Sequence, residues 1–565
     1  MTAPSDIQVR LEGVGKLAIE NARNRLIVPA VLFVLCFATL GWRVVSLGIS
    51  GSDEVTRSAR EVPGPTASVE RRSIVDRNGV LLAGNLSTKS LYAHPRLLLD
   101  ADEAADRLAD TLPDLDRRQL HARLASGRNF VWIKRKLIPR EQWAVNRLGI
   151  PAFGFKSEMR RVYPQGSLAA HVLGHVDIDN AGIAGVERYF EDELAHPEGR
   201  REPLSLALDV RVQHALRDEL SRAMVAHNAA GAGGIVMDVE TGEMLALVSL
   251  PDFDPNQPAE ASDAARFNRV TLGVYEMGST FKTFTIAQAL DSGVAGLGDK
   301  YDATEPIHEA RWTIHDDHPK ARWLSVPEIY IFSSNIGSAR MALDIGVEAQ
   351  QAFLSRVGMF RRSEIELPEV GAPIVPTEWR KINAMTVAYG HGIAVSPVQL
   401  VSGIAAMVNG GVLRPATVLK VSDRAQVGGT RVINADTSEA VRAMMRLVVA
   451  QGTGRQADAK GYLVGGKTGT AEKNIGGSYS REALLSSFVG VFPSTKARYV
   501  VFAMLDAPQG NAETLGFAGG GWVAAPVVRQ VVTRIAPMLG VRPHDTEAEP
   551  TSAVTLAVAG RMDLP

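Results

Sequence analysis

Three short polar motifs, far apart along the chain, constrain what this sequence can fold into more than any other feature. They are Ser279-Thr280-Phe281-Lys282, Ser333-Ser334-Asn335 and Lys467-Thr468-Gly469-Thr470. A serine and a lysine three residues apart lie on the same face of a helix, so the amine can reach the hydroxyl and remove its proton. Each motif alone occurs often by chance, but all three in this order indicate a fold that brings distant segments into one cleft.

The residue types of the first two motifs suit acyl transfer through a serine. The Ser279 hydroxyl is a weak nucleophile until a neighbouring base removes its proton. Lys282 can be that base only if burial and nearby positive charge lower its pKa from the usual value of about 10.4. Lys467 would supply the charge if it lay in the same cleft. Ser333 could then pass a proton between groups, and Asn335 could orient both Lys282 and a substrate amide.

The third motif suits recognition of a carboxylate. Lys467, Thr468 and Thr470 offer a positive charge and two hydroxyl groups, and Gly469 would let a ligand approach the backbone of a strand closely. The backbone N–H groups of Ser279 and Thr470 could form an oxyanion hole. We therefore expect acyl transfer on a substrate that ends in a free carboxylate.

Two other segments are weaker candidates for a site. His315-Asp316-Asp317-His318 invites a metal interpretation, but Pro319 follows directly and no third ligand cluster is evident, so we expect a solvated loop that borders the cleft. Residues 516–521 are glycine-rich but lack the Lys-Ser/Thr that follows in a phosphate-binding loop. We expect these glycines to permit tight packing beside a final helix at residues 524–539.

Composition excludes several classes of function. The chain has 61 Lys and Arg against 62 Asp and Glu, so no basic excess indicates a nucleic-acid partner. Its one cysteine, Cys36, can form neither an intrachain disulfide nor a zinc cluster. The composition therefore indicates neither a nucleic-acid partner nor a cysteine-bound zinc.

An apolar segment near the N-terminus predicts a single transmembrane helix at residues 26–49. Leu26 to Trp42 carries no ionisable side chain apart from Cys36, and apolar residues continue beyond Arg43 to Ile49. A span needs about 20 apolar residues, and Arg43 can extend its side chain to the interface. A cleaved signal peptide is the alternative, but Gly41-Trp42-Arg43 is a poor cleavage site and the segment begins late. Four basic residues precede the segment, so residues 1–25 should remain cytoplasmic: Arg10, Lys16, Arg23 and Arg25.

The rest of the chain divides into two predicted domains, at residues 50–200 and 201–540, followed by a loose tail at 541–565. In the first domain, Ser73–Leu82 predicts a hairpin around Asn78-Gly79, and residues 101–148 predict amphipathic helices. In the second, apolar patterns and turn residues predict these elements: helices at 210–226, at 279–290 and from Ser396-Pro397 to Asn409-Gly410, a hairpin of strands 234–238 and 244–250, and antiparallel strands at 462–471, 484–492 and 499–505.

With these motifs in place, the chain resembles the class B penicillin-binding proteins, and within them the cell-division (septal) peptidoglycan transpeptidases. Further matching segments include Ile74-Val75-Asp76-Arg77-Asn78-Gly79, Tyr163-Pro164, Gly185-Val186-Glu187 and Tyr389-Gly390-His391-Gly392. The resemblance implies an α+β protein with a single N-terminal transmembrane helix, an elongated periplasmic pedestal of the dimerisation type, and a penicillin-binding transpeptidase domain. That domain would contain an antiparallel β-sheet flanked by α-helices.

The resemblance also implies a reaction. The serine would form an acyl-enzyme with the penultimate D-Ala of a stem pentapeptide, the terminal D-Ala would leave, and an amine of a second strand would complete the cross-link. β-Lactams would acylate the same serine, and the resemblance implies no cofactor and no metal. The implied roles are nucleophile for Ser279, base for Lys282, second motif for Ser333 and Asn335, and carboxylate-binding strand for Lys467, Thr468 and Thr470.

Partners and location follow from the same resemblance. It implies a single-pass inner-membrane protein with a periplasmic catalytic domain. The stretch between the anchor and residue 200 has no room for a glycosyltransferase domain, so we expect a separate membrane-embedded glycan polymerase and other division-complex proteins as partners. The sequence departs from the family pattern at Arg72, Met277 and Thr283, where glycine or proline is usual. These departures put contacts of the pedestal in doubt and leave the chemistry intact.

Three alternatives remain open at this stage. One is a class B transpeptidase of the elongation type. Another is a penicillin-sensing receptor or a hydrolase related to β-lactamases. The third is a division scaffold that keeps the fold without turnover.

Overall fold

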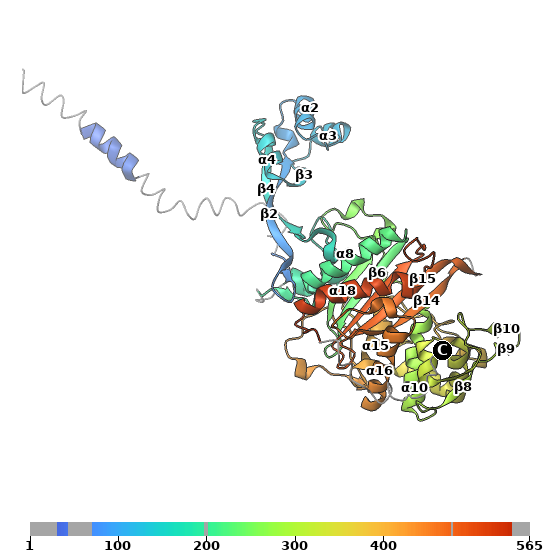
Figure 1. Ribbon diagram of the computed structural model, residues 1–565. Helices are drawn as coiled ribbons and strands as arrows, with labels where there is room; N and C mark the ends of the chain where they lie inside the picture. Colours follow the sequence, from blue (N-terminus) through green and yellow to red (C-terminus); the bar gives the residue numbers. More distant parts are fainter. Residues whose placement is uncertain (1–30, 43–69, 197–201, 476–477, 545–565) are drawn as a thin grey trace, which may run out of the picture. The chain divides into compact units, whose positions relative to one another are not determined.

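A computed structural model describes residues 31–42, 70–196, 202–475 and 478–544 of the chain (Figure 1). Residues 1–69 and 70–565 form two separate units. In the first unit, residues 31–42 are helical. No helix within the described ranges is long and apolar enough to cross a membrane, and the remainder of the predicted 26–49 span falls on residues outside the description.

The N-terminal part of the second unit is built on a small sheet. Its main strands are β1 (Ile74–Val75), β2 (Leu81–Ala93), β3 (Val131–Leu137) and β4 (Phe153–Val162), and β5 (Leu204–Ser205) pairs in parallel with β1. The predicted hairpin is confirmed, because Ile74 pairs antiparallel with Ala83. Asp76 fixes its turn: one carboxylate oxygen accepts hydrogen bonds of 2.8 Å from the N–H groups of both Asn78 and Val80.

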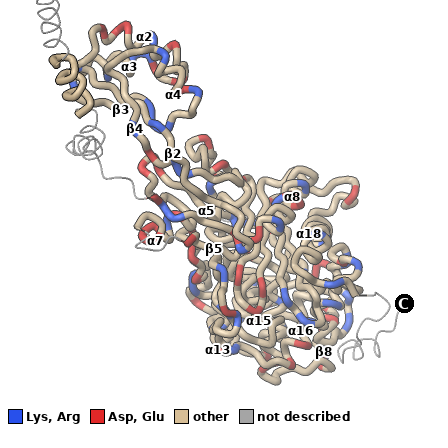
Figure 2. The backbone as a smooth tube through the Cα atoms, turned by 90° about the vertical axis from the view of Figure 1, so that its left-hand side faces the viewer, with Lys and Arg blue, Asp and Glu red and all other residues tan. Residues whose placement is uncertain are grey.

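The helices predicted between residues 101 and 148 are partly confirmed. They are α2 (Ala101–Thr111), α3 (Arg117–Leu124) and α4 (Pro139–Asn146), and they gather around β3 and the adjoining part of β2 and β4 (Figure 2). The prediction was wrong at β3, because Val131-Trp132-Ile133 alternates buried and half-buried side chains and pairs with β2. This part of the chain has its own hydrophobic core.

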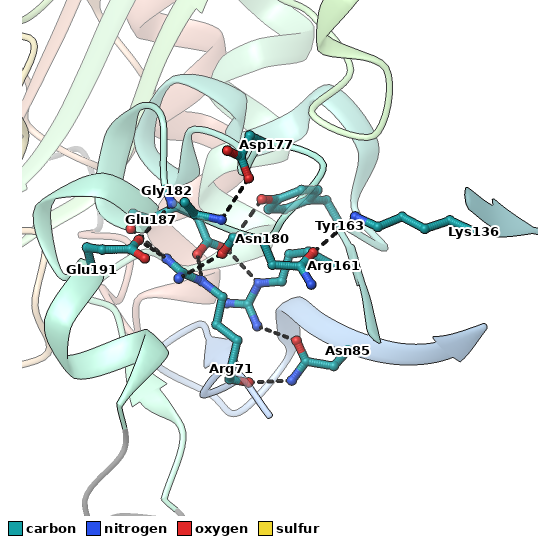
Figure 3. A network of polar contacts seen from close by, with 11 residues as sticks. Arg71, Asn85, Lys136, Arg161, Tyr163, Asp177, Asn180, Gly182, Glu187 and Glu191 are labelled. Atoms are coloured by element: carbon teal, nitrogen blue, oxygen red, sulfur yellow. Dashed lines mark hydrogen bonds and ion pairs between the residues drawn. The ribbon is translucent and has the colours of Figure 1, made fainter. Parts of the chain in front are cut away.

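A cluster of paired charges lies at the base of this sheet (Figure 3). Glu187, on α6 (Gly185–Tyr189), is fully buried and accepts from the Nε atoms of Arg71 at 2.7 Å and Arg161 at 2.6 Å. Arg71 also donates to the backbone carbonyl of Glu187 at 2.7 Å and to Glu191, on α7 (Glu191–Ala195), at 2.9 Å. Two guanidinium groups and two carboxylates thus neutralise one another. The neighbouring Arg72, unusual for the family, donates to the Glu202 carbonyl.

The large sheet has the order β14 (Gly465–Ile475), β15 (Ser478–Phe492), β16 (Tyr499–Asp506), β6 (Gly231–Asp238) and β7 (Met244–Leu250), and every pairing is antiparallel. The strands predicted in the second domain are therefore confirmed, and so is their direction. Successive residues of β16 point to opposite faces: Phe502 joins one hydrophobic core and Val501 the other.

Helices cover both faces of this sheet, as predicted (Figure 1). On one face lie α8 (Val210–Ala226) and α18 (Ala525–Met538), and on the other α10 (Lys282–Asp291), α15 (Pro397–Val408) and α16 (Ala435–Gln451). The bounds of α8 match the prediction. The Ser396 side chain caps α15 by accepting from the Gln399 N–H, as expected.

The other α-helices and strands of the described residues connect or flank these elements. They are α5 (Ala170–Leu173), α9 (Asp263–Arg266), β8 (Lys300–Asp302), β9 (Ile307–Glu309), β10 (Trp312–Ile314), β11 (Trp323–Ser325), α11 (Val326–Ile331), α12 (Asn335–Ile345), α13 (Val347–Arg356), α14 (Lys381–Val387), β12 (Val412–Leu413), β13 (Thr430–Arg431) and α17 (Gly520–Val523).

Candidate active site

The serine of the first motif lies in a tight turn that leads into α10. Residues Gly278–Phe281 form one turn of 3₁₀-helix, and the α-helix begins at Lys282. Gly278 has φ of +53°, and a Cβ there would lie 2.6 Å from the Thr470 carbonyl oxygen. Only glycine therefore lets this turn lie against the edge strand β14. The predicted buried helix is confirmed, with Ser279 one turn earlier in a tighter helix.

The Lys282 amine lies among four oxygen atoms. Its Nζ is 2.8 Å from Ser279 Oγ, 2.8 Å from the Ser333 carbonyl, 3.1 Å from Ser333 Oγ and 2.7 Å from Asn335 Oδ1. Two of these are carbonyl oxygens, which can only accept. The two N–H bonds of a neutral amine satisfy them, and the lone pair is left for the proton of Ser279.

Lys467 approaches the same group of atoms from the edge strand. Its Nζ lies 3.0 Å from Ser333 Oγ, so this hydroxyl bridges the two amines. Ser333 has φ of +61°, a conformation that costs a non-glycine residue energy and often marks a functional position. The Lys467 Nζ also lies 5.8 Å from the centre of the Tyr330 ring, and the Tyr330 hydroxyl is 2.8 Å from that of Thr283. Thr283, which departs from the family pattern, is thus hydrogen-bonded to Tyr330.

Asp316 holds the second motif in place, a role that was not predicted from the sequence. Its carboxylate accepts from the Ser334 hydroxyl at 2.7 Å and from the N–H groups of Asn335 at 2.6 Å and Ile336 at 2.9 Å. Ser334 caps α12. Asn335 Nδ2 donates to the His315 carbonyl at 3.0 Å, and this contact turns its amide oxygen toward Lys282. The segment 315–318 is thus the expected loop bordering the cleft, with one buried carboxylate.

Burial sets the charge state of both lysines. Lys282 and Lys467 have 0% exposed surface, and neither forms an ion pair within the part of the chain that the structure describes. Desolvation lowers the pKa of Lys282 to about 7, although Asp316 and Asp317 oppose the shift. Desolvation also lowers the pKa of Lys467, and the nearby Lys282 adds to that effect. A pKa of about 7 leaves a large share of Lys282 neutral at neutral pH. Burial produces this shift, and the positive charge expected from Lys467 is not among its causes.

The edge strand forms one wall of a cleft of about 450 Å³. Ser279, Ser333, Thr468 and Thr470 all line it, so the structure brings the three motifs together. The Thr468 hydroxyl lies 2.9 Å from that of Thr453, and Thr470 Oγ1 accepts from the Gly520 N–H at 3.0 Å. The other lining residues are Asp317, His318, Phe332, Gly452, Thr453, Arg455, Gln456 and Gly519 to Trp522.

Gly469 serves a different purpose from the one expected. A Cβ at this position would lie 2.4 Å from Ser487 Oγ and 2.8 Å from the Met277 carbonyl. Protein atoms, rather than an open cleft, occupy that space, so the glycine permits close packing of the nucleophile turn. Gly520 is constrained in the same way by the Ser487 and Gly469 carbonyl oxygens, at 2.2 and 2.4 Å from a Cβ. This confirms tight packing in the glycine-rich segment, against β14 and β15.

Comparison with known proteins decides the family. Residues 232–533 match the penicillin binding protein transpeptidase domain, and residues 66–207 match the penicillin-binding protein dimerisation domain. The chain belongs to the class B penicillin-binding proteins. Its geometry fits that family, because a serine, two lysines and an asparagine meet in one cleft.

Relatives cover nearly the whole chain. A Caulobacter vibrioides protein named "Probable peptidoglycan D,D-transpeptidase FtsI" is 38% identical over 93% of this chain and 90% of its own length. The Escherichia coli K12 peptidoglycan D,D-transpeptidase FtsI is 29% identical over 92% of both chains. The fold is shared with penicillin binding protein 3 of Mycobacterium tuberculosis complexed with ampicillin, at a TM-score of 0.67, 24% identity, and coverage of 86% of this chain and 98% of that one.

Proposed function

We propose that this protein is the peptidoglycan D,D-transpeptidase that cross-links stem peptides at the division septum, and that β-lactams inhibit it. The names of its relatives and the transpeptidase domain support this activity. One observation carries the proposal: the Lys282 amine lies 2.8 Å from Ser279 Oγ with its N–H bonds directed at two carbonyl oxygens. That arrangement prepares a neutral base beside a nucleophile.

The proposed acylation follows from these positions. Lys282 takes the proton of Ser279 as the serine attacks the carbonyl carbon of the penultimate D-Ala, and the backbone N–H groups of Ser279 and Thr470 stabilise the oxyanion. Ser333 passes the proton toward the nitrogen of the departing D-Ala, since its hydroxyl lies within 3.1 Å of both amines. Lys467, Thr468 and Thr470 bind the terminal carboxylate of the donor. Asn335 orients Lys282 and the substrate amide.

The surroundings of the enzyme belong to the same proposal. Residues 26–49 would anchor it in the inner membrane as a single pass, with residues 1–25 in the cytoplasm and the catalytic domain in the periplasm. Residues 50–200 would form the pedestal, 201–540 the transpeptidase domain and 541–565 a tail. The family matches, which begin at residues 66 and 232, are consistent with this division. A membrane-embedded glycan polymerase and other division proteins would be its partners.

Covalent labelling by a fluorescent penicillin tests the nucleophile. The wild-type protein should form a labelled band that survives denaturation, and Ser279→Ala should abolish it. Ser292→Ala, at the other end of α10, is the matched control and should label like the wild type, because Ser292 Oγ contacts only the Gln288 and Ala289 carbonyls within its own helix. Undiminished labelling of Ser279→Ala would refute the assignment.

Two further measurements, the lifetime of the penicilloyl-enzyme and the shape of depleted cells, separate the hydrolase and elongation alternatives from the proposed function. A receptor or transpeptidase holds the penicilloyl group for a long time, whereas a β-lactamase-like hydrolase releases it rapidly. Depletion of the protein should give filamentous cells with unfinished septa. Swollen round cells would instead support the elongation role.

A further inference from the structure

A histidine-containing turn lies directly beside the nucleophile turn, and the proposed acylation does not use it. It is Tyr389-Gly390-His391-Gly392. The Gly278 N–H donates to the Gly390 carbonyl at 3.3 Å, and a Cβ at Gly390 would lie 2.1 Å from the Gly278 carbonyl oxygen. The Tyr389 ring centre is 5.9 Å from Lys282 Nζ. The turn that carries His391 is therefore packed against the turn that carries Ser279, and the Tyr389 ring neighbours both Lys282 and His391.

Glu276 holds His391 and its surroundings. Its Oε1 accepts from the Gly392 N–H at 2.9 Å and from the Tyr479 hydroxyl at 2.9 Å. Its Oε2 lies 3.6 Å from His391 Nδ1 and is buried without a hydrogen bond in the described structure. The His391 ring lies between those of Tyr389 and Tyr479, with centres 5.3 and 6.2 Å away. The negative charge beside Nδ1 favours a proton on that nitrogen, which leaves Nε2 free to act as a base.

The groups along β14 change from a lysine and hydroxyls at one end to carboxylates at the other. At one end the strand offers Lys467 and the hydroxyls of Thr468 and Thr470, which suit a carboxylate. Two residues beyond Thr470, on the same side of the strand, comes Glu472. There, next to Glu276, a second cavity of about 530 Å³ opens, whose other lining residues are Val274, Tyr275, Ile374, Gly392, Ala394, Ala471, Lys473 and Leu485. The Lys473 amine in this lining is paired with Asp506 at 2.5 Å. The carboxylates of Glu276 and Glu472 suit an ammonium group, and His391 is the neighbour in sequence of the lining residue Gly392.

We propose that this second cavity receives the acceptor strand, and that His391, held by Glu276, takes the proton from the acceptor ammonium before the amine attacks the acyl-enzyme. The inference rests on the proposed transpeptidase function and concerns only its second half. The ligand is a primary amine on a peptide, and His391 would be a catalytic residue for aminolysis alone.

Protons balance over the step. The acceptor R–NH₃⁺ gives one proton to His391 and becomes R–NH₂, whose lone pair forms the bond to the acyl carbon of the ester. As the tetrahedral intermediate collapses, the bond from carbon to Ser279 Oγ breaks. The second proton of the nitrogen passes to Lys282 and then to Ser279 Oγ, which restores the free serine. His391 releases its proton to solvent.

The charge around His391 leaves it neutral and ready to accept. Burial lowers its pKa, while the carboxylate of Glu276 raises it; Lys282 in its protonated form lowers it further, and Glu472 and Asp317 oppose the shift. The phenols that face it, Tyr389 and Tyr479, have pKa values raised by burial and stay neutral.

The test separates the two half-reactions in full-length protein. A thioester whose acyl group ends in D-alanine serves as donor, D-alanine serves as acceptor amine, and hydrolysis is measured alongside aminolysis. His391→Gln keeps a polar side chain but cannot accept a proton at neutral pH. We expect its aminolysis to fall about tenfold or more, with penicillin acylation and thioester hydrolysis within about twofold of the wild type. His308→Gln, on the exposed strand β9, is the matched control and should keep both rates.

The pH dependence provides a measurement that a structural role would not change. In the wild type, the ratio of aminolysis to hydrolysis should fall as His391 is protonated in acid. The pH profile of His391→Gln should lack this decrease. An unchanged ratio in His391→Gln would overturn the inference. Equal losses in aminolysis, hydrolysis and penicillin acylation would also overturn it. Absent penicillin labelling of the wild type would instead contradict the proposed function itself.

Discussion

Two clusters of buried cationic residues in this protein are built on opposite principles. At the base of the small sheet, Arg71 and Arg161 surround Glu187 with contacts of 2.6 and 2.7 Å (Figure 3). In the cleft, Lys282 and Lys467 are as deeply buried, but their polar neighbours are hydroxyl and carbonyl oxygens. Both clusters hold two basic side chains, and only the first supplies counter-charges in contact.

The difference teaches how a fold assigns charge states. An arginine stays protonated at any physiological pH, so a buried one needs a carboxylate, and removing that partner is costly. A lysine can lose its proton, so burial without a carboxylate turns it into a base. The arginine cluster contributes stability and the lysine cluster contributes reactivity, which is why substitutions in the two should have opposite consequences.

The largest expected effect is loss of reactivity in Lys282→Met. Without the base, acylation by penicillin should slow by about a thousandfold or more, as measured by stopped-flow or gel labelling. The fold should not suffer. Because the pKa of Lys282 is lowered from 10.5 to about 7, the unfolded chain binds more protons between these values, so this lysine costs stability increasingly as pH falls toward 7.

The unfolding free energy of Lys282→Met at pH 7 should therefore equal or exceed that of the wild type. Lys300→Met, at an exposed position on β8, is the control and should change neither the acylation rate nor the unfolding free energy. A Lys282→Met protein that unfolds more readily than the wild type would show that the buried lysine stabilises the fold instead of costing stability.

The next largest effect is loss of stability in Glu187→Gln. This change leaves Arg71 and Arg161 buried with one carboxylate fewer, and breaking a buried pair costs about 3–5 kcal/mol. Denaturant unfolding should report that loss, while penicillin acylation per folded molecule should remain near the wild-type rate. Glu193→Gln, half-exposed and 3.5 Å from Arg72, should cost far less. A small effect of Glu187→Gln would mean that the arginines are solvated or paired in another way.

The smallest effect is expected at Thr470, where the cleft wall is held by a neutral hydrogen bond. Thr470→Val removes the acceptor of the Gly520 N–H, now at 3.0 Å, and should cost about 0.5–1.5 kcal/mol. Thr470→Val should also slow acylation by penicillin. Thr470→Ser should retain most of the stability and most of the acylation rate. If valine and serine behaved alike in both assays, the hydroxyl would have no part in the site.

The sequence predicted elements whose signals are local. The expected types are found for the helix at 210–226, the cap at Ser396-Pro397 and the three strands around 462–505. Periodicity, capping residues and turns depend on residues that are close in sequence. The convergence of the three motifs was predictable only from their combination. β3 was mistaken for part of a helix because its pairing with β2, rather than its charged flanks, decides its structure.

The features that escaped prediction depend on tertiary contacts. Nothing next to Asp316 in the sequence shows that its carboxylate would cap the second motif. Likewise, the constraint on Gly469 comes from Met277 and Ser487, which lie close only in the folded chain. The pairing of Glu276 with His391 joins two turns that are distant in sequence. A pattern of residues identifies the chemistry, and only the fold shows which groups support it.

The pH dependence of penicillin acylation tests most directly the claim that a neutral lysine activates the serine. In the wild type, the second-order rate constant should rise about tenfold per pH unit in acid and level off above a pKa of about 7, the value that burial gives Lys282. A rate that continued to rise toward the ordinary lysine pKa near 10.4, or that did not change with pH, would contradict the account.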